Sequence, residues 1–204
     1  MNGRDFSGYV LAGGKSSRMK TDKTLLKIAG RTFIERAVNV LESACGHPAR
    51  VVLNSKQKNL FKSFSADFDR VFDVLENRGA LGGIHAALRD CPGEFAIVLA
   101  VDLPFIDAKV IEKIMKTAVF ENNYSAVVPR QADGRLQPLC AVYRPAKCLP
   151  RIEKLLSENN SLPVRAFLET IPVKIIEEEF LSGNRNVFAN INTPADYEKL
   201  TTRE

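Results

Sequence analysis

Along this chain, short apolar runs alternate with longer stretches in which hydrophobic side chains recur every three or four residues. A short apolar run bounded by turn-forming residues indicates a buried strand, whereas the longer spacing indicates a helix with one buried face. The predicted strands lie at residues 9–12, 51–53, 70–72, 95–101, 125–128, 139–143 and 173–176. The predicted helices lie at residues 32–43, 80–90, 107–115, 146–158 and 161–168, with a last helix opening at 193–194.

Strands that alternate with helices predict an α/β fold, in which helices cover both faces of a mostly parallel central sheet. The chain has 204 residues, 45% of them hydrophobic, without an internal repeat or a low-complexity linker, so we expect one domain spanning residues 1–204. In open sheets of this kind, ligands bind beyond the carboxyl ends of the strands. The small or polar residues that follow predicted strands are Gly13, Asn54, Asp73 and Asp102.

The loop after the first predicted strand combines glycine with positive charge. Gly13 and Gly14 let the backbone approach a ligand closely and turn its N–H groups toward it. Arg18 and Lys23 add cationic side chains, so the segment suits a triphosphate, which needs donors and charge neutralisation. The glycine spacing fits neither the Walker A pattern nor the dinucleotide-binding fingerprint, and a lone glycine pair is also typical of an ordinary turn.

Asp102 ends the most apolar run of the chain and precedes Leu103-Pro104. Magnesium prefers oxygen ligands and commonly takes one or two carboxylates together with substrate phosphates. A carboxylate at the tip of a buried strand is therefore a candidate magnesium ligand. An aspartate in a loop can equally cap a turn or a helix, but Asp107 is the better candidate for capping the helix that follows.

The formal net charge of +5 favours anionic partners, but Lys and Arg are spread along the chain, so nucleic-acid binding is not expected. No apolar run reaches the length of a membrane-spanning helix, and residues 1–7 lack the apolar stretch of a secretory signal. We therefore expect a cytoplasmic protein that does not bind membranes. We also expect a monomer, although nothing in these patterns determines the oligomeric state. The four cysteines lack C-x-x-C spacing, and with two histidines a zinc site is not expected, so they are predicted to be free thiols.

Residues 11–23, Leu-Ala-Gly-Gly-x-Ser-x-Arg-Met-x-x-Asp-Lys, resemble the signature of the molybdenum cofactor guanylyltransferases. The family has glycine after Arg-Met, whereas this chain has Lys20. The resemblance implies a Rossmann-like, three-layer nucleotidyltransferase fold. It also implies an Mg²⁺-dependent transfer of GMP from GTP to the phosphate of (Mo-)molybdopterin, forming molybdopterin guanine dinucleotide and pyrophosphate. The similarity continues in the expected order at residues 25–26, 30–31, 79–84, 101–105, 137–139 and 190–194.

The resemblance also implies roles for individual residues. Arg18, Lys23 and Asp102 would be catalytic, because Mg²⁺ on Asp102 and the two cations would stabilise the charge that develops on the phosphates. Asn190 and Asn192 would lie near the acceptor, although asparagine before Thr-Pro is also typical of turns. The residues implied to contact GTP are Leu11, Ala12, Gly13, Gly14, Lys23, Asn54, Asp73 and Asp102.

Other functions remain open from the sequence alone. A cytidylyltransferase acting on the same cofactor typically has Leu-Ala-Ala-Gly where this chain has residues 11–14, and the smaller Gly13 leaves room for a purine, which favours GTP. Sugar-phosphate nucleotidyltransferases share the loop but carry further motifs that this chain lacks. A GTP-binding protein that docks a partner without turnover is an alternative of another class. The resemblance also suggests contact with molybdoenzyme assembly proteins.

Overall fold

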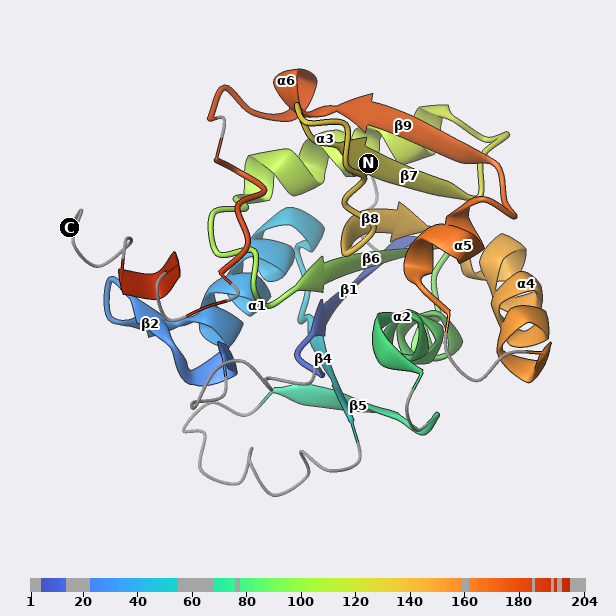
Figure 1. The fold of residues 1–204 in the computed structure, drawn as a ribbon, viewed down its shortest axis with the longest axis horizontal. Coiled ribbons are helices and arrows are strands. Elements are labelled where there is room, and N and C mark those ends of the chain that lie inside the picture. Colours follow the sequence, from blue (N-terminus) through green and yellow to red (C-terminus); the bar gives the residue numbers. More distant parts are fainter. Residues whose placement is uncertain are drawn as a thin grey trace.

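Figure 1 shows a computed structural model of the chain, with a long central sheet between two layers of helices. The main sheet has the strand order β5-β4-β1-β6-β8-β7-β9 in the described part of the chain, and β2 and β3 form a separate hairpin. The structure describes residues 5–13, 23–54, 68–75, 78–158, 162–184, 186–191, 193 and 196–198, without the side chain of Lys23. The strands of the main sheet are β1 (Phe6–Leu11), β4 (Arg50–Asn54), β5 (Asp69–Asp73), β6 (Phe95–Ala100), β7 (Ala126–Arg130), β8 (Cys140–Tyr143) and β9 (Val173–Glu177).

The central sheet is mostly parallel, as the alternating pattern predicts. Strands β5, β4, β1 and β6 run parallel to one another, and β7 runs parallel to β9. Strand β8 lies between β6 and β7 and is antiparallel to both. The return from β7 to β8 passes through Gly134, whose φ of 85° is accessible to glycine at no steric cost.

Helices cover both faces of the sheet, which gives the expected three layers. One face packs against α1, α3 and α6, and the other packs against α2, α4 and α5, so two separate groups of buried side chains form the core. Among the helices in the described part of the chain, none is both long enough and apolar enough to cross a bilayer. The helices are α1 (Phe33–Cys45), α2 (Gly79–Asp90), α3 (Ala108–Phe120), α4 (Pro145–Glu158), α5 (Val164–Leu168) and α6 (Glu178–Leu181), and a 3-10 helix, η2, spans Lys23–Leu25.

Local side-chain hydrogen bonds fix where the helices on the α1 side begin. Thr32 and Glu35 form a capping box, in which the Glu35 N–H donates to Thr32 Oγ1 at 3.3 Å and the Thr32 N–H donates to Glu35 Oε2 at 2.8 Å. Asp107 caps α3, because its Oδ1 accepts the Val110 N–H at 2.9 Å. The prediction that Asp107 is the capping residue is therefore confirmed.

A small hairpin precedes α1 and was not predicted. Strands β2 (Lys27–Ile28) and β3 (Arg31–Thr32) pair antiparallel across Ala29 and Gly30, both of which have positive φ angles. This backbone conformation is typical of the tight turns that join two antiparallel strands. Because Thr32 is both the end of β3 and the cap of α1, the hairpin is fixed to the start of that helix.

Candidate active site

The ends of the two central strands lie side by side at the carboxyl edge of the sheet. Leu11 of β1 is in register with Ala100 of β6, and the Val101 N–H donates to the Leu11 carbonyl oxygen at 3.2 Å. Gly13 follows Leu11 by two residues and Asp102 follows Ala100 by two residues, so both lie just beyond the paired ends of the two strands. Leu11 and Ala12 are buried and Gly13 is exposed, so the chain emerges from the core at the glycine.

A second pair of predicted site residues lies at the same edge, at the ends of the two strands on the other side of β1 from β6. Asn54, the last residue of β4, is in register with Asp73, the last residue of β5. Asp73 is half-buried, and its Oδ1 accepts the Leu75 N–H at 2.9 Å. Burial raises the pKa of the Asp73 carboxyl, while the Leu75 hydrogen bond and the charge of His85 act in the opposite direction.

The glycines of the 79–84 motif belong to α2, which packs against this edge. An ideal Cβ on Gly82 would lie 2.6 Å from Asp73 Oδ2, so this carboxylate lies directly against the helix backbone. An ideal Cβ on Gly83 would lie 3.5 Å from Leu11 Cδ2, which is ordinary packing distance. We did not predict the approach of Asp73 to Gly82. The signal available in the sequence was a glycine pair inside a predicted helix, where glycine is otherwise disfavoured.

The two late motifs of the chain also reach the carboxyl edge. The Asp102 carbonyl oxygen accepts the Ile191 N–H at 3.1 Å, which places the exposed residue Asn190 next to the loop that carries Asp102. The Leu139 carbonyl oxygen accepts the Ala100 N–H at 2.7 Å, so the 137–139 motif lies beside the end of β6. Segments far apart in the sequence are thus brought together around Asp102.

The predicted site residues Gly14, Arg18 and Asn192 lie outside the described part of the chain, as does Lys20, which stands where the family has glycine. The backbone of Lys23 opens η2, next to the helix α1 layer, but its side chain is not described. The roles predicted for these residues therefore stay predictions. The predicted residues that the structure brings to the carboxyl edge are Leu11, Ala12, Gly13, Asn54, Asp73, Asp102 and Asn190.

The donor set at this edge fits a metal ion that is held mainly by its substrate. Within the described residues, no cluster of three or more His, Cys, Asp and Glu side chains could hold an ion by itself. A single carboxylate such as Asp102 fits Mg²⁺, which usually keeps several waters and takes its remaining ligands from substrate phosphates. It does not fit zinc, which needs three or four protein ligands.

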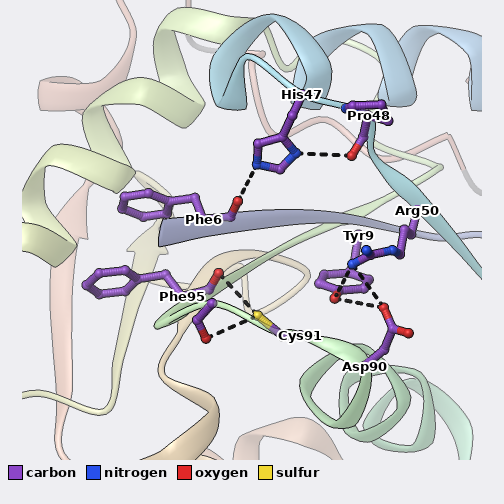
Figure 2. Close-up of polar contacts among 9 residues, drawn as sticks. Phe6, Tyr9, His47, Pro48, Arg50, Asp90, Cys91 and Phe95 are labelled. Atoms are coloured by element: carbon purple, nitrogen blue, oxygen red, sulfur yellow. Dashed lines mark hydrogen bonds and ion pairs between the residues drawn. The ribbon is translucent and has the colours of Figure 1, made fainter. Parts of the chain in front are cut away.

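The opposite, amino end of the sheet holds a polar cluster of a different kind (Figure 2). The Tyr9 hydroxyl donates to Asp90 Oδ2 at 2.9 Å, and Arg50 Nη1 donates to the Tyr9 oxygen at 3.2 Å. Arg50 also pairs with Asp90 at 3.2 Å. Because these groups satisfy one another and join β1, β4 and the end of α2, their role is structural. Near them, the Cys91 thiol donates weakly to the Phe95 carbonyl oxygen at 3.5 Å.

The fold and the carboxyl edge together define a class of enzyme. Residues 8–175 match the family model described as the MobA-like NTP transferase domain. An exposed glycine after the first strand and an aspartate after the central strand, both at the edge where ligands bind, are consistent with that match. The protein is a nucleotidyltransferase.

Comparison with similar proteins identifies the family of nucleotidyltransferases to which the chain belongs. The chain is 32% identical to the probable molybdenum cofactor guanylyltransferase of Clostridium perfringens, over 97% of each chain. It is 33% identical to the molybdenum cofactor guanylyltransferase of Desulfosudis oleivorans, over 95% of this chain and 93% of the relative. The crystal structure of molybdopterin-guanine dinucleotide biosynthesis protein A from Archaeoglobus fulgidus superposes with a TM-score of 0.81 at 26% identity, over 97% of each chain. The chain belongs to the MobA-like molybdenum cofactor guanylyltransferase family, as the sequence motifs predict.

Proposed function

We propose that the protein transfers GMP from GTP to the phosphate of molybdopterin, giving molybdopterin guanine dinucleotide and pyrophosphate. The names of the similar proteins support this activity. The observation that carries it is that Gly13 and Asp102 follow the paired ends of β1 and β6, with Asn190 beside the loop that carries Asp102. A glycine, a carboxylate and an amide side chain at one edge suit a bound triphosphate and a second, phosphate-bearing substrate.

The distance between Asp73 and Asp102 along the carboxyl edge is consistent with a nucleotide that lies across the strands. Asp73 and Asp102 follow strands that are three places apart in the sheet, which corresponds to about 14 Å at about 4.8 Å per strand. An extended nucleoside triphosphate bridges such a distance. We place the triphosphate at Gly13 and Asp102, and the base at Asn54 and Asp73.

The chemistry of Asp73 favours guanine over cytosine. Guanine presents N–H donors at its N1 and N2 positions, and an ionised carboxylate only accepts hydrogen bonds. Cytosine offers a single amino group beside a ring nitrogen that accepts. With Oδ1 already bonded to Leu75, Oδ2 of Asp73 remains to accept from the base.

The reaction needs positioning and charge stabilisation more than acid–base chemistry. An oxygen of the molybdopterin phosphate attacks the α-phosphorus of GTP, the bond between the α-phosphorus and its bridging oxygen breaks, and pyrophosphate leaves. The nucleophile is already an anion, so it needs no strong general base. Asp102 would hold Mg²⁺, which supplies positive charge next to the phosphates when it is bound. Gly13, Lys23 and Arg18 would add N–H donors and charge.

Pyrophosphate release from the purified protein tests this proposal. We expect release with GTP, Mg²⁺ and molybdopterin together, and little release when molybdopterin is omitted or GTP is replaced by CTP, ATP or UTP. Release with CTP in preference to GTP would identify a cytidylyltransferase instead. Tight GTP binding in calorimetry without pyrophosphate release would instead support the alternative of a binding protein without turnover.

A further inference from the structure

The last described part of the chain crosses the carboxyl edge between the α6 end of the molecule and the hairpin of β2 and β3 (Figure 1). We call residues 186–191, 193 and 196–198 the C-terminal strap. Val187, Phe188 and Ile191 are buried in the same group of core side chains as α1 and α3. Asn190 is exposed between these anchors, so the strap carries it at the surface of the site.

Two backbone carbonyl groups hold the part of the strap that follows Asn190. The Ile191 N–H donates to the Asp102 carbonyl oxygen at 3.1 Å. Further along, the Tyr197 hydroxyl donates to the Lys27 carbonyl oxygen at 2.6 Å, a contact between residues 170 positions apart. The Tyr197 ring also meets the Phe33 ring edge-on, with centroids 6.3 Å apart and planes at 64°.

The turn that carries Tyr197 is itself fixed. The Thr193 N–H donates to Asp196 Oδ2 at 2.8 Å, and the Asp196 N–H donates to Thr193 Oγ1 at 3.2 Å. This reciprocal pair is a capping box, which orients the first turn of a helix. The capping box therefore fixes the orientation of the Tyr197 side chain. The Tyr197 hydroxyl in turn connects the strap to the hairpin through Lys27.

We propose that Tyr197 is a positioning residue for acceptor binding. Its hydrogen bond to Lys27 ties the strap to the hairpin ahead of α1, and thereby holds Asn190 beside the Asp102 loop. The part of the inference that concerns the acceptor rests on the proposed function, whereas the constraint on the strap does not. Tyr197 touches no reacting atom, so it acts through the strap alone.

Amide hydrogen exchange at Ile191, followed by NMR, tests the constraint without any substrate. Tyr197→Phe keeps the contact with Phe33 and removes the hydroxyl, and we expect exchange about fivefold faster, the size of one net hydrogen bond. Tyr197→Ala also removes the ring and should give faster exchange still. Tyr9→Phe, which removes a tyrosine hydroxyl at the other end of the sheet, is the matched control and should leave this amide unchanged. An Ile191 amide that exchanges at the wild-type rate in Tyr197→Phe overturns the proposal.

Steady-state kinetics test the consequence for the acceptor. We expect Tyr197→Phe to raise the KM for molybdopterin about fivefold and to leave the KM for GTP within about twofold. A general loss of structure would raise both constants, and that result overturns the positioning role. If the wild-type protein does not turn over GTP and molybdopterin, the proposed function fails and the acceptor role of Tyr197 fails with it. The exchange measurement still decides whether Tyr197 constrains the strap.

Discussion

Replacing Asp73 with asparagine should separate the contribution of the carboxylate to protein stability from its contribution to GTP binding. The amide oxygen of the introduced asparagine can accept the Leu75 N–H as Asp73 Oδ1 does at 2.9 Å, so the end of β5 keeps its conformation. The two side chains have nearly the same shape, so the close approach to Gly82 is also kept. The change is confined to the second oxygen, where an acceptor is replaced by an N–H₂ donor.

The loss of GTP affinity follows from that exchange of donor for acceptor. A hydrogen bond that involves a charged group contributes about 1.5–3 kcal/mol, so the KM for GTP should rise about 10- to 150-fold. The new donor would face the N–H groups of guanine. Xanthine has a carbonyl oxygen in place of the guanine amino group, so the Asp73→Asn variant should use XTP better, relative to GTP, than the wild type does.

Although Asp73→Asn should weaken GTP binding, it should make the unliganded protein more stable. Because burial raises the pKa of Asp73, the folded chain holds this proton more tightly than the unfolded chain does. Stability is therefore lost as the pH rises from the unfolded value of about 3.9 through the folded value, and the full cost is present above it. Asp73→Asn removes the cost, so its Tm should exceed that of the wild type at pH 8, and the difference should shrink toward pH 4.

Kinetics with both nucleotides and calorimetry across that pH range measure the two effects separately. An unchanged KM for GTP in a folded Asp73→Asn variant would refute the assignment of this carboxylate to the base. A raised KM with an unchanged ratio of XTP to GTP use would place Asp73 on the ribose instead. A Tm lower than that of the wild type at pH 8 would contradict the argument from burial.

Three further predictions concern other parts of the molecule. Asp102→Ala should lower Mg²⁺-dependent pyrophosphate release by at least about 100-fold with little change in Tm, and turnover within about tenfold of the wild type would exclude it as the metal ligand. Tyr9→Phe leaves Asp90 and Arg50 paired, so urea unfolding should show a loss of about 1 kcal/mol, without a change in the KM for GTP. A thiol reagent at pH 8 should label the native protein slowly, at the partly exposed Cys91 first, and fast reaction of several thiols would contradict the buried placement. Burial raises the pKa of the remaining thiols to about 12, at Cys45, Cys140 and Cys148.

Features that depend on neighbouring residues were predictable from the sequence. The apolar runs identified the strands, and therefore the residues at their ends, because a buried strand and its exit from the core leave a local signature. Helix caps could be predicted likewise, because each one joins residues three positions apart. Examples are the capping pair of Thr193 and Asp196 and the cap that Asp107 provides for α3. The free thiols followed from the lack of any paired spacing among the cysteines.

Features that depend on distant residues were not predictable in this way. The hairpin of β2 and β3 consists of two-residue strands with no apolar period, so nothing in the sequence separates it from a loop. The insertion of β8 between β6 and β7 depends on pairing across the sheet. The contacts of Asp73 with Gly82 and of Tyr197 with Lys27 join segments whose proximity only the folded chain creates.

Neighbouring residues of β1 contribute to stability and to the proposed site. Tyr9 is fully buried and tied to Asp90 and Arg50, which fixes β1 against α2 and β4 (Figure 2). Two residues further on, Leu11 enters the carboxyl edge, and the chain becomes exposed at Gly13. A strand that is held on both sides can present the residue that follows it, Gly13, without a large loss of conformational entropy when a ligand binds. We therefore expect the polar cluster to support the proposed nucleotide site by holding β1 in place, and its loss should lower stability well before it alters affinity.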